Sequence, residues 1–131
     1  MPSNIEVLRD GYEAFGRGDI GGITRNFDDD VEFVGPNSQR MPGAGSHRGK
    51  DAVGALLAGM QERWDGLTWS PDEFVSEGET VVVLGHMEGR AKATGARVKV
   101  PFVHVWRMSG GKVMRGQALT DTAVVADALG S

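Results

Sequence analysis

Residues 99–122 read KVPFVHVWRMSGGKVMRGQALTDT, and this stretch decides the fold. Apolar and polar residues alternate on both sides of residues 109–111, which predicts two antiparallel strands joined by a tight Gly-containing turn. Because side chains alternate between the two faces of a strand, Phe102, His104 and Trp106 share one face. An imidazole between two aromatic side chains on a face that must be buried predicts the floor of a pocket.

The rest of the chain predicts helices first and strands afterwards. Apolar residues recur at helical spacing in three N-terminal segments, and a Gly-, Pro- and Ser-rich loop interrupts them. From Gly66 to Thr120 the patterns are typical of strands and turns, and a capped helix follows at the end. Helices that precede an antiparallel meander indicate an α+β fold, with the helices on one face of a curved sheet. The predicted helices are 4–15, 20–27, 51–64 and 121–129, the predicted strands are 31–34, 68–75, 81–88, 99–108 and 112–120, and the predicted loop is 35–49.

The composition limits the classes of function. At 131 residues the chain is long enough for one domain with a single core, which we expect to span 1–131. A formal net charge of −4 argues against nucleic-acid binding, and the lack of cysteine excludes disulfides and thiolate catalysis. The first residues lack a signal-peptide pattern and the longest apolar run, 52–60, is too short to span a membrane. We therefore expect a soluble, cytoplasmic protein without membrane contact.

His104 has two interpretations. In the first it is a functional group, a general acid or base or a hydrogen-bond donor to a ligand oxygen, because imidazole titrates near neutral pH. In the second it is a core histidine with one polar partner. The sequence leaves both open, since apolar pockets use a few polar groups to orient a ligand. Asp121 is the acid nearest to this strand pair along the chain, and a helix N-cap explains it more simply.

The other polar clusters have structural explanations. On the strand 81–88, His86 lies on the more polar face, so we expect it at the surface. His47 lies in the predicted loop, either at a pocket rim or exposed, and the loop matches neither a phosphate-binding loop nor a dinucleotide fingerprint. Residues 28–30 are three adjacent aspartates whose side chains diverge, which favours a solvated turn over a metal site. The histidine spacing suits no metal either, so none is predicted.

Five segments in order carry a resemblance to a known family. They are YEAFGRGDIGGITRNFDDDVEFVGP at 12–36, HRGKDAVGALL at 47–57, SEGETVVVLGHMEG at 76–89, FVHVWRMSGGKV at 102–113 and DTAVVADAL at 121–129. The ordered set resembles the nuclear transport factor 2-like superfamily, most closely its SnoaL-like, ketosteroid-isomerase-like branch. The resemblance implies a cone-shaped, strongly bent antiparallel β-sheet wrapped by N-terminal helices, with a short C-terminal helix. It also implies an apolar cavity and a homodimer.

The resemblance further implies where the catalytic groups of related enzymes fall in this chain. The base of steroid isomerases with this fold falls at Gly35, and their oxyanion tyrosine falls at Gly11, beside Tyr12. Their second acid falls at His104, and the acids of epoxide hydrolases with this fold fall at His104 and near Ala118. Most of the known acidic machinery is therefore missing, and His104 is the candidate catalytic residue.

The resemblance also implies which side chains surround the cavity. By this correspondence Phe15, Leu56, Trp106, Ala118 and Thr120 line it together with His104. We add Tyr12, Met60 and Phe102 as further candidates for substrate binding, although core packing also explains Met60.

Two functions follow from such a pocket. In the first, the cavity takes a hydrophobic oxygenated molecule, polyketide-, terpenoid- or steroid-like, and His104 moves a proton in an isomerisation, cyclisation or dehydration without a cofactor. Burial among aromatic rings would keep this histidine neutral. In the second, the protein is a non-catalytic carrier or sensor, and His104 only anchors the ligand. Val103 and Val105 face the other side of the strand and predict an outer sheet face through which two copies form a homodimer.

Overall fold

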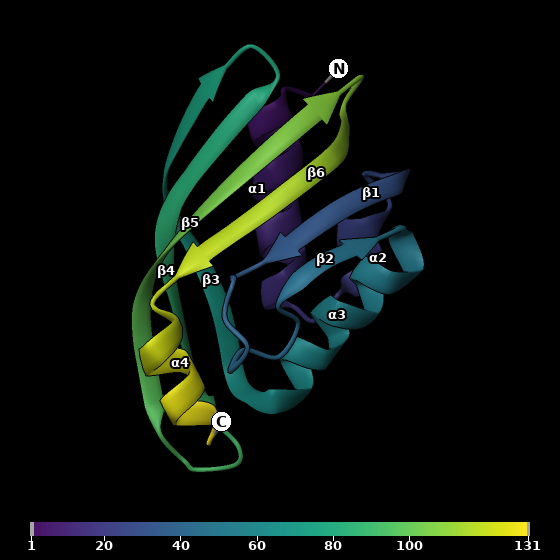
Figure 1. Ribbon diagram of the computed structural model, residues 1–131. Coiled ribbons are helices and arrows are strands. Elements are labelled where there is room, and N and C mark those ends of the chain that lie inside the picture. Colours follow the sequence, from purple (N-terminus) through teal and green to yellow (C-terminus); the bar gives the residue numbers. More distant parts are fainter. Residues whose placement is uncertain (1, 131) are drawn as a thin grey trace.

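In the computed structural model, which describes residues 2–130, six strands form one curled sheet with helices around it (Figure 1). The strand order is β2-β1-β6-β5-β4-β3; β1 and β6 run parallel, and the other neighbouring pairs are antiparallel. The predicted α+β fold, with a strongly bent sheet, N-terminal helices and a short C-terminal helix, is confirmed, while the sheet that was predicted to be antiparallel contains one parallel pair, β1 and β6. The elements are α1 (Asn4–Gly16), α2 (Ile20–Thr24), β1 (Phe27–Gly35), β2 (Gly45–Arg48), α3 (Lys50–Arg63), β3 (Trp64–Glu77), β4 (Thr80–Ala91), β5 (Arg97–Ser109), β6 (Lys112–Thr120) and α4 (Thr122–Leu129).

Polar caps and a glycine set the ends of the helices. The Ser3 hydroxyl accepts a hydrogen bond from the Glu6 backbone N–H at 3.1 Å, and the Glu6 carboxylate accepts one from the Ser3 N–H at 3.4 Å. Asp121 caps α4 by accepting from the Val124 N–H at 3.3 Å, as predicted. Gly130 follows α4 with φ of 79°, a left-handed conformation that glycine adopts readily. None of the helices within residues 2–130 is long and apolar enough to cross a membrane.

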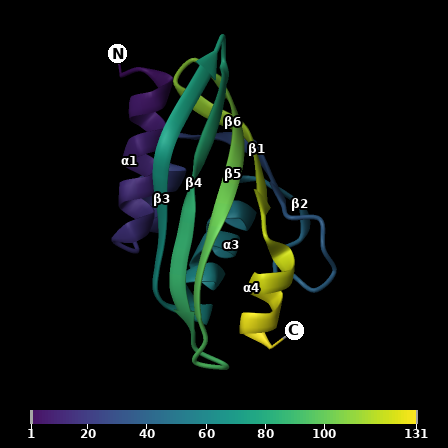
Figure 2. The same ribbon diagram turned by 90° about the vertical axis from the view of Figure 1, so that its left-hand side faces the viewer.

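A glycine allows the sheet to bend around the core. β3 and β4 pair with an irregularity between Pro71 and Glu73, opposite Gly85. A Cβ atom at Gly85 would overlap the carbonyl oxygen of Ser70 and touch the Phe102 ring. The missing side chain therefore lets the two backbones approach at this bulge, and bulges increase the local bend of a strand. Figure 2 shows the resulting curl of the long strands.

The concave face of the sheet and the helices enclose the core. α1 packs against β3, α3 against β1, and α4 against β5 (Figures 1 and 2). On β5, Phe102, His104 and Trp106 are buried, whereas Val103 and Val105 on the outer face are half-buried. The alternation predicted for this strand is confirmed. Within residues 2–130, His104 is the one polar side chain that is buried as deeply as the hydrophobic core.

The prediction of a helix over 20–27 is wrong at its C-terminal end. α2 ends at Thr24, and Phe27 is already the first residue of β1, where it is buried and pairs with Val113 of β6. The three aspartates at 28–30, predicted as a turn, lie in the same strand. The pairing of β1 with β6 is irregular between Phe27 and Glu32, so this polar segment does not need a buried face. Tertiary pairing thus overrides the local preference of the sequence.

The predicted loop 35–49 contains a short strand. β2 pairs antiparallel with the end of β1, with His47 opposite Phe33 and Gly45 opposite Gly35. A Cβ atom at Gly35 would overlap the carbonyl oxygen of Gly43, so glycine is needed where the chain turns back. β2 is a four-residue strand at the edge of the sheet and lacks the apolar alternation that marks a strand in sequence.

Candidate ligand-binding site

Two apolar cavities lie between the helices and the concave face of the sheet. The first, which we call the α1 cavity, has a volume of about 40 Å³, and the second, the α4 cavity, has a volume of about 50 Å³. Trp69 and His104 line both and so form the wall between them. The α1 cavity is bordered chiefly by Leu8, Gly11, Tyr12, Phe15, Asn26 and Trp106, and the α4 cavity by Met41, Met60, Arg63, Phe102, Thr120 and Leu129.

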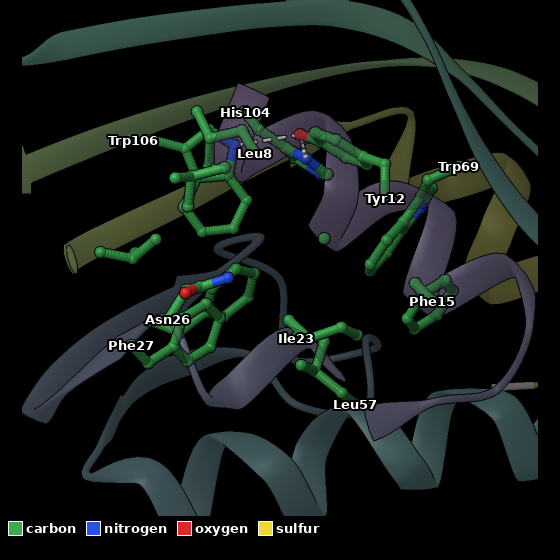
Figure 3. Close-up of a pocket in the computed structure, with 14 residues that line it drawn as sticks. Leu8, Tyr12, Phe15, Ile23, Asn26, Phe27, Leu57, Trp69, His104 and Trp106 are labelled. Atoms are coloured by element: carbon green, nitrogen blue, oxygen red, sulfur yellow. Dashed lines mark hydrogen bonds between the residues drawn. The ribbon is translucent and has the colours of Figure 1, made fainter. Parts of the chain in front are cut away.

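Three hydrogen-bonded aromatic side chains form one wall of the α1 cavity (Figure 3). The Tyr12 hydroxyl oxygen lies 2.7 Å from His104 Nδ1, and Trp106 Nε1–H donates to the same hydroxyl at 3.0 Å. Tyr12 comes from α1, and the other two come from the inner face of β5. Only 7%, 2% and 8% of the surfaces of Tyr12, His104 and Trp106 are exposed. Hydrogen bonds in such a dry site hold the three rings in a fixed arrangement.

This arrangement determines which nitrogen of His104 carries the proton. The indole of Trp106 can only donate, so the Tyr12 proton needs another acceptor, and His104 Nδ1 is the one in reach among residues 2–130. We therefore assign Nδ1 as the acceptor and Nε2 as the protonated nitrogen. Nε2 has no hydrogen-bond partner in the described part of the chain. In this part of the chain, every polar side-chain atom that is completely enclosed has a hydrogen-bond partner. Because Nε2 has no partner, it is not completely enclosed and borders open cavity space.

Burial keeps both titratable groups of this wall neutral. Desolvation lowers the pKa of His104 from 6.5 to about 3. Burial also raises the pKa of Tyr12 above its ordinary value, an effect that the hydrogen bond from Trp106 opposes. A neutral imidazole with so low a pKa is a weak base, because a general base works best when its pKa is near the working pH. The geometry suits His104 Nε2–H as a hydrogen-bond donor better than as a proton acceptor.

Asn26 is a polar group of the α1 cavity that the sequence analysis missed. It lies between α2 and β1, and Figure 3 shows its side chain among those that line the cavity. Its backbone carbonyl accepts from the Val113 N–H at 2.8 Å, while its amide side chain has no partner within residues 2–130. An asparagine between a helix and a strand is ordinary turn chemistry in a sequence, so no local pattern singles it out. The amide can both donate to and accept from a ligand.

The structure divides the predicted lining residues between the two cavities. Leu56 borders neither cavity: it is half-buried and lies over Gly43, whereas the next residue, Leu57, borders the α1 cavity. The Thr120 hydroxyl already donates to the Pro101 carbonyl at 2.8 Å. The predicted residues that border the α1 cavity are Tyr12, Phe15 and Trp106, and those that border the α4 cavity are Met60, Phe102, Ala118 and Thr120.

The other two histidines lie away from both cavities. His86 is half-buried on the outer face of β4, and its Nδ1 lies 2.8 Å from Asp72 Oδ2. His47 is in β2 rather than in a loop, and its Nε2 lies 2.8 Å from the Gly43 carbonyl oxygen. Among residues 2–130, no three His, Asp or Glu side chains are grouped so that they could hold a metal ion.

The wall between the cavities consists of two rings, His104, which is held by a hydrogen bond, and Trp69, which is not. Trp69 stacks on Phe15 with ring centroids 4.4 Å apart and an interplanar angle of 17°, and it meets His104 nearly perpendicularly at 5.2 Å. The indole N–H of Trp69 has no hydrogen-bond partner in residues 2–130, and the side chain is only half-buried. His104, by contrast, is bonded to Tyr12. Movement of Trp69 is therefore the simplest way to join the two cavities.

A curled mixed sheet whose concave face and helices surround an apolar interior defines the nuclear transport factor 2-like class of α+β proteins. A sequence model of the SnoaL-like domain matches residues 8–116. The chain therefore belongs to the SnoaL-like family, as the sequence predicted. None of the curated proteins compared with the chain is significantly similar to it.

Solved structures share this fold over nearly the whole chain. TerC, crystallised with polyporic acid, is 32% identical with a TM-score of 0.87, and 98% of each chain is covered. An NTF2-like protein of unknown function from Burkholderia pseudomallei K96243 is 30% identical with a TM-score of 0.89, and both chains are covered completely, at 100%. A putative SnoaL-like polyketide cyclase from Jannaschia sp. CCS1 is 20% identical with a TM-score of 0.84, covering 98% of this chain and 92% of that one, and shows the fold alone.

Proposed function

We propose that the protein binds a flat, hydrophobic, oxygenated small molecule, polyketide-, terpenoid- or steroid-like, whose oxygen accepts a hydrogen bond from His104 Nε2. The observation that carries this proposal is the buried Nε2–H donor without a protein partner, held in place by Tyr12 and Trp106. A polar group left unpaired in an apolar interior is costly unless a ligand or water satisfies it. Asn26 offers a second polar contact in the α1 cavity.

The cavity volumes bear on how such a ligand fits. A single water needs roughly 10–15 Å³ of such cavity volume, so each cavity alone holds about three or four waters. A ligand of two or more rings is too large for either cavity alone, and displacement of Trp69 from the wall would let it extend from one cavity into the other. That TerC, a relative of similar length, was crystallised with polyporic acid supports an organic occupant.

The binding proposal is tested with a panel of aromatic ketones: acetophenone, 2-acetonaphthone and 4-acetylbiphenyl. Binding to the wild type, His104→Leu and His104→Gln is followed by calorimetry. The leucine lacks the donor and should weaken binding about tenfold, while the glutamine, which retains an N–H, should lose much less. Equal affinity of all three proteins excludes His104 as the anchor. A panel that shows no binding to the wild type overturns the ligand class.

The same donor supports a second candidate function, catalysis without a cofactor. A fixed donor that faces a carbonyl oxygen stabilises the negative charge that develops there when a water molecule or a buffer base accepts the α-proton, as enolisation by an isomerase, cyclase or dehydratase requires. The test is the exchange of α-protons of 2-tetralone in D₂O, followed by NMR. Exchange faster than in buffer that is lost in His104→Leu supports catalysis. Binding without faster exchange leaves the alternative, a carrier or sensor.

We propose in addition that two copies associate through the outer sheet face. Leu84, Val103 and Leu119 lie in one row across β4, β5 and β6, and the two leucines are 37% and 48% exposed. Such a row of exposed apolar side chains is typical of an interface. Sedimentation at micromolar concentration should give a dimer that Leu119→Lys disrupts. Val124→Lys is the control because this exposed residue lies on α4. A monomeric wild type contradicts the proposal.

A further inference from the structure

The α4 cavity leads into a surface hollow with a cationic border. This hollow, of about 300 Å³, shares Pro42, Arg63 and Leu129 with the α4 cavity and is further lined by Lys92 and Ala93. It lies where the end of α3, the β4–β5 turn and α4 come together (Figures 1 and 2). We call it the vestibule. A ligand that fills the α4 cavity therefore has one end close to Arg63 and Lys92.

Arg63 is placed at this opening by its helix. It is the last residue of α3, and its Nη1 lies 3.3 Å from the position that a Cβ of Gly59 would take. The guanidinium thus folds back over the glycine one turn earlier, where any other residue would crowd it. Lys92 is its neighbour, since the Lys92 N–H donates to the Arg63 carbonyl at 3.1 Å. The two residues are thus neighbours through their backbones, and both of them line the vestibule.

Neither cation is neutralised within residues 2–130. No carboxylate there pairs with Arg63 or Lys92, and none lines the vestibule or the α4 cavity. Asp127 on α4 pairs with Arg40 instead, and Asp65 pairs with Arg90. The protein carries a formal net charge of −4, so this is a locally positive site on an acidic protein. Paired cations beside an apolar cavity suit an anionic oxygen group.

We propose that the ligand is an organic acid, with its anionic group between Arg63 and Lys92, its apolar body in the α4 cavity and its neutral oxygen toward His104. This inference rests on the proposed function, because it assumes that a small molecule occupies the α4 cavity. It adds the charge of the ligand and the direction in which it lies. Arg63 contributes a planar fork that fits a carboxylate, and Lys92 adds a second charge.

The test compares a matched pair of probes, 4′-acetylbiphenyl-4-carboxylate and its neutral carboxamide. In wild-type protein the acid should bind about tenfold more tightly than the amide, and 0.5 M NaCl should reduce this preference because the site is solvent-exposed. Arg63→Gln, and separately Lys92→Gln, should lower affinity for the acid toward that of the amide and leave the amide unchanged. Both residues are exposed, so both variants should fold, which thermal unfolding checks.

Arg107→Gln is the matched control, because Arg107 is an exposed arginine of β5 that contacts Thr80 and lines neither cavity. An acid preference that is lost in Arg63→Gln but kept in Arg107→Gln supports the inference. Equal binding of acid and amide, or equal losses in Arg63→Gln and Arg107→Gln, overturns it while the proposed function stands. If neither probe binds the wild type, the proposed function fails as well.

Discussion

The α1 cavity and the α4 cavity share two residues, yet different forces hold their walls. Around the α1 cavity, Tyr12, His104 and Trp106 are buried, hydrogen-bonded and carried by the long helix α1 and the strand β5. Around the α4 cavity, contacts at the surface connect two loops to α4. The Arg40–Asp127 ion pair connects the β1–β2 loop to it, and the Thr94 hydroxyl of the β4–β5 turn donates a hydrogen bond to the Ala128 carbonyl. Exposed ion pairs contribute little to stability. We therefore expect the α1 side to be the rigid end of the molecule and the α4 side to be the adaptable end, with Trp69 between them.

The sharpest test of this contrast compares core deletions on the two sides. Phe15→Ala removes a ring that is 1% exposed, borders the α1 cavity and stacks on Trp69, so we expect it to lower the free energy of unfolding by about 3–5 kcal/mol. Met60→Ala removes a half-buried side chain that borders the α4 cavity, where we expect a loss of about 1–2 kcal/mol. Urea unfolding measures both. Equal losses would mean that the two ends are equally rigid.

The second prediction concerns pH, because the rigid side contains a buried neutral histidine. The pKa of His104 is about 3 in the folded protein and 6.5 without burial, so the unfolded chain binds the extra proton between these values. Stability is therefore fully present above pH 6.5 and is lost as the pH falls toward 3. From these two pKa values, protonation of His104 alone should lower the free energy of unfolding by about 3 kcal/mol between pH 7 and pH 4.

The measurement is urea unfolding at pH 7, 5.5 and 4 in wild type and His104→Gln. The variant cannot take up this proton, so its stability should fall less steeply with acid. Carboxylates contribute to acid unfolding in both proteins. Glu32 is one of them, because its pKa is lowered, mainly by the hydrogen bond that it accepts from the Ser46 hydroxyl. The difference between the two curves isolates His104. Parallel curves would show that the imidazole is hydrated in the folded protein.

The third prediction adds atoms instead of removing them. A Cβ atom at Gly116 would overlap the six-membered ring of Trp106, so Gly116→Ala must displace the indole that donates to Tyr12. We expect a loss of about 1–3 kcal/mol, typical of overpacking. Ala118→Val, two residues further along β6, extends into the open α4 cavity and should cost less than about 1 kcal/mol. A reversed order of these two thermal midpoints would contradict the assignment of the rigid end.

Much of the rigid end could be predicted from the sequence. The strict alternation in β5 places Phe102, His104 and Trp106 together on the inner face, and helical periodicity brings Tyr12 and Phe15 of α1 to the core. Both are local patterns with a known period, and burial of one face then follows from the hydrophobic effect. What the sequence could not show is that the Tyr12 hydroxyl meets His104, 92 positions away. That contact depends on how α1 crosses the sheet, which no local pattern encodes.

The adaptable end was harder to predict for the same reason. β2 is stabilised by its pairing with β1 rather than by its own residues, and the border of the vestibule joins Arg63 and Lys92 from elements far apart in the chain. Asn26 faces the α1 cavity because β1 starts four residues earlier than predicted, at Phe27. In each case the decisive contact is long-range. Periodicity predicts which face of an element is buried, and the loops and polar contacts that complete a site are left undetermined.

The smallest expected effect tests which cavity a ligand enters. Gly11 lies within α1 and borders the α1 cavity, and a Cβ atom there would meet nothing within 4 Å. Gly11→Ala should therefore stabilise the protein by about 0.5–1 kcal/mol, because alanine is the better helix former. Gly16→Ala, at the end of α1 and also without a neighbour within 4 Å, is the control that does not border the cavity. If 4-acetylbiphenyl reaches past Trp69 to the rigid end, the methyl group of Gly11→Ala narrows its space and weakens binding severalfold, while Gly16→Ala binds as the wild type does. Unchanged binding in both would confine the ligand to the adaptable end and leave His104 as the inner limit of its site.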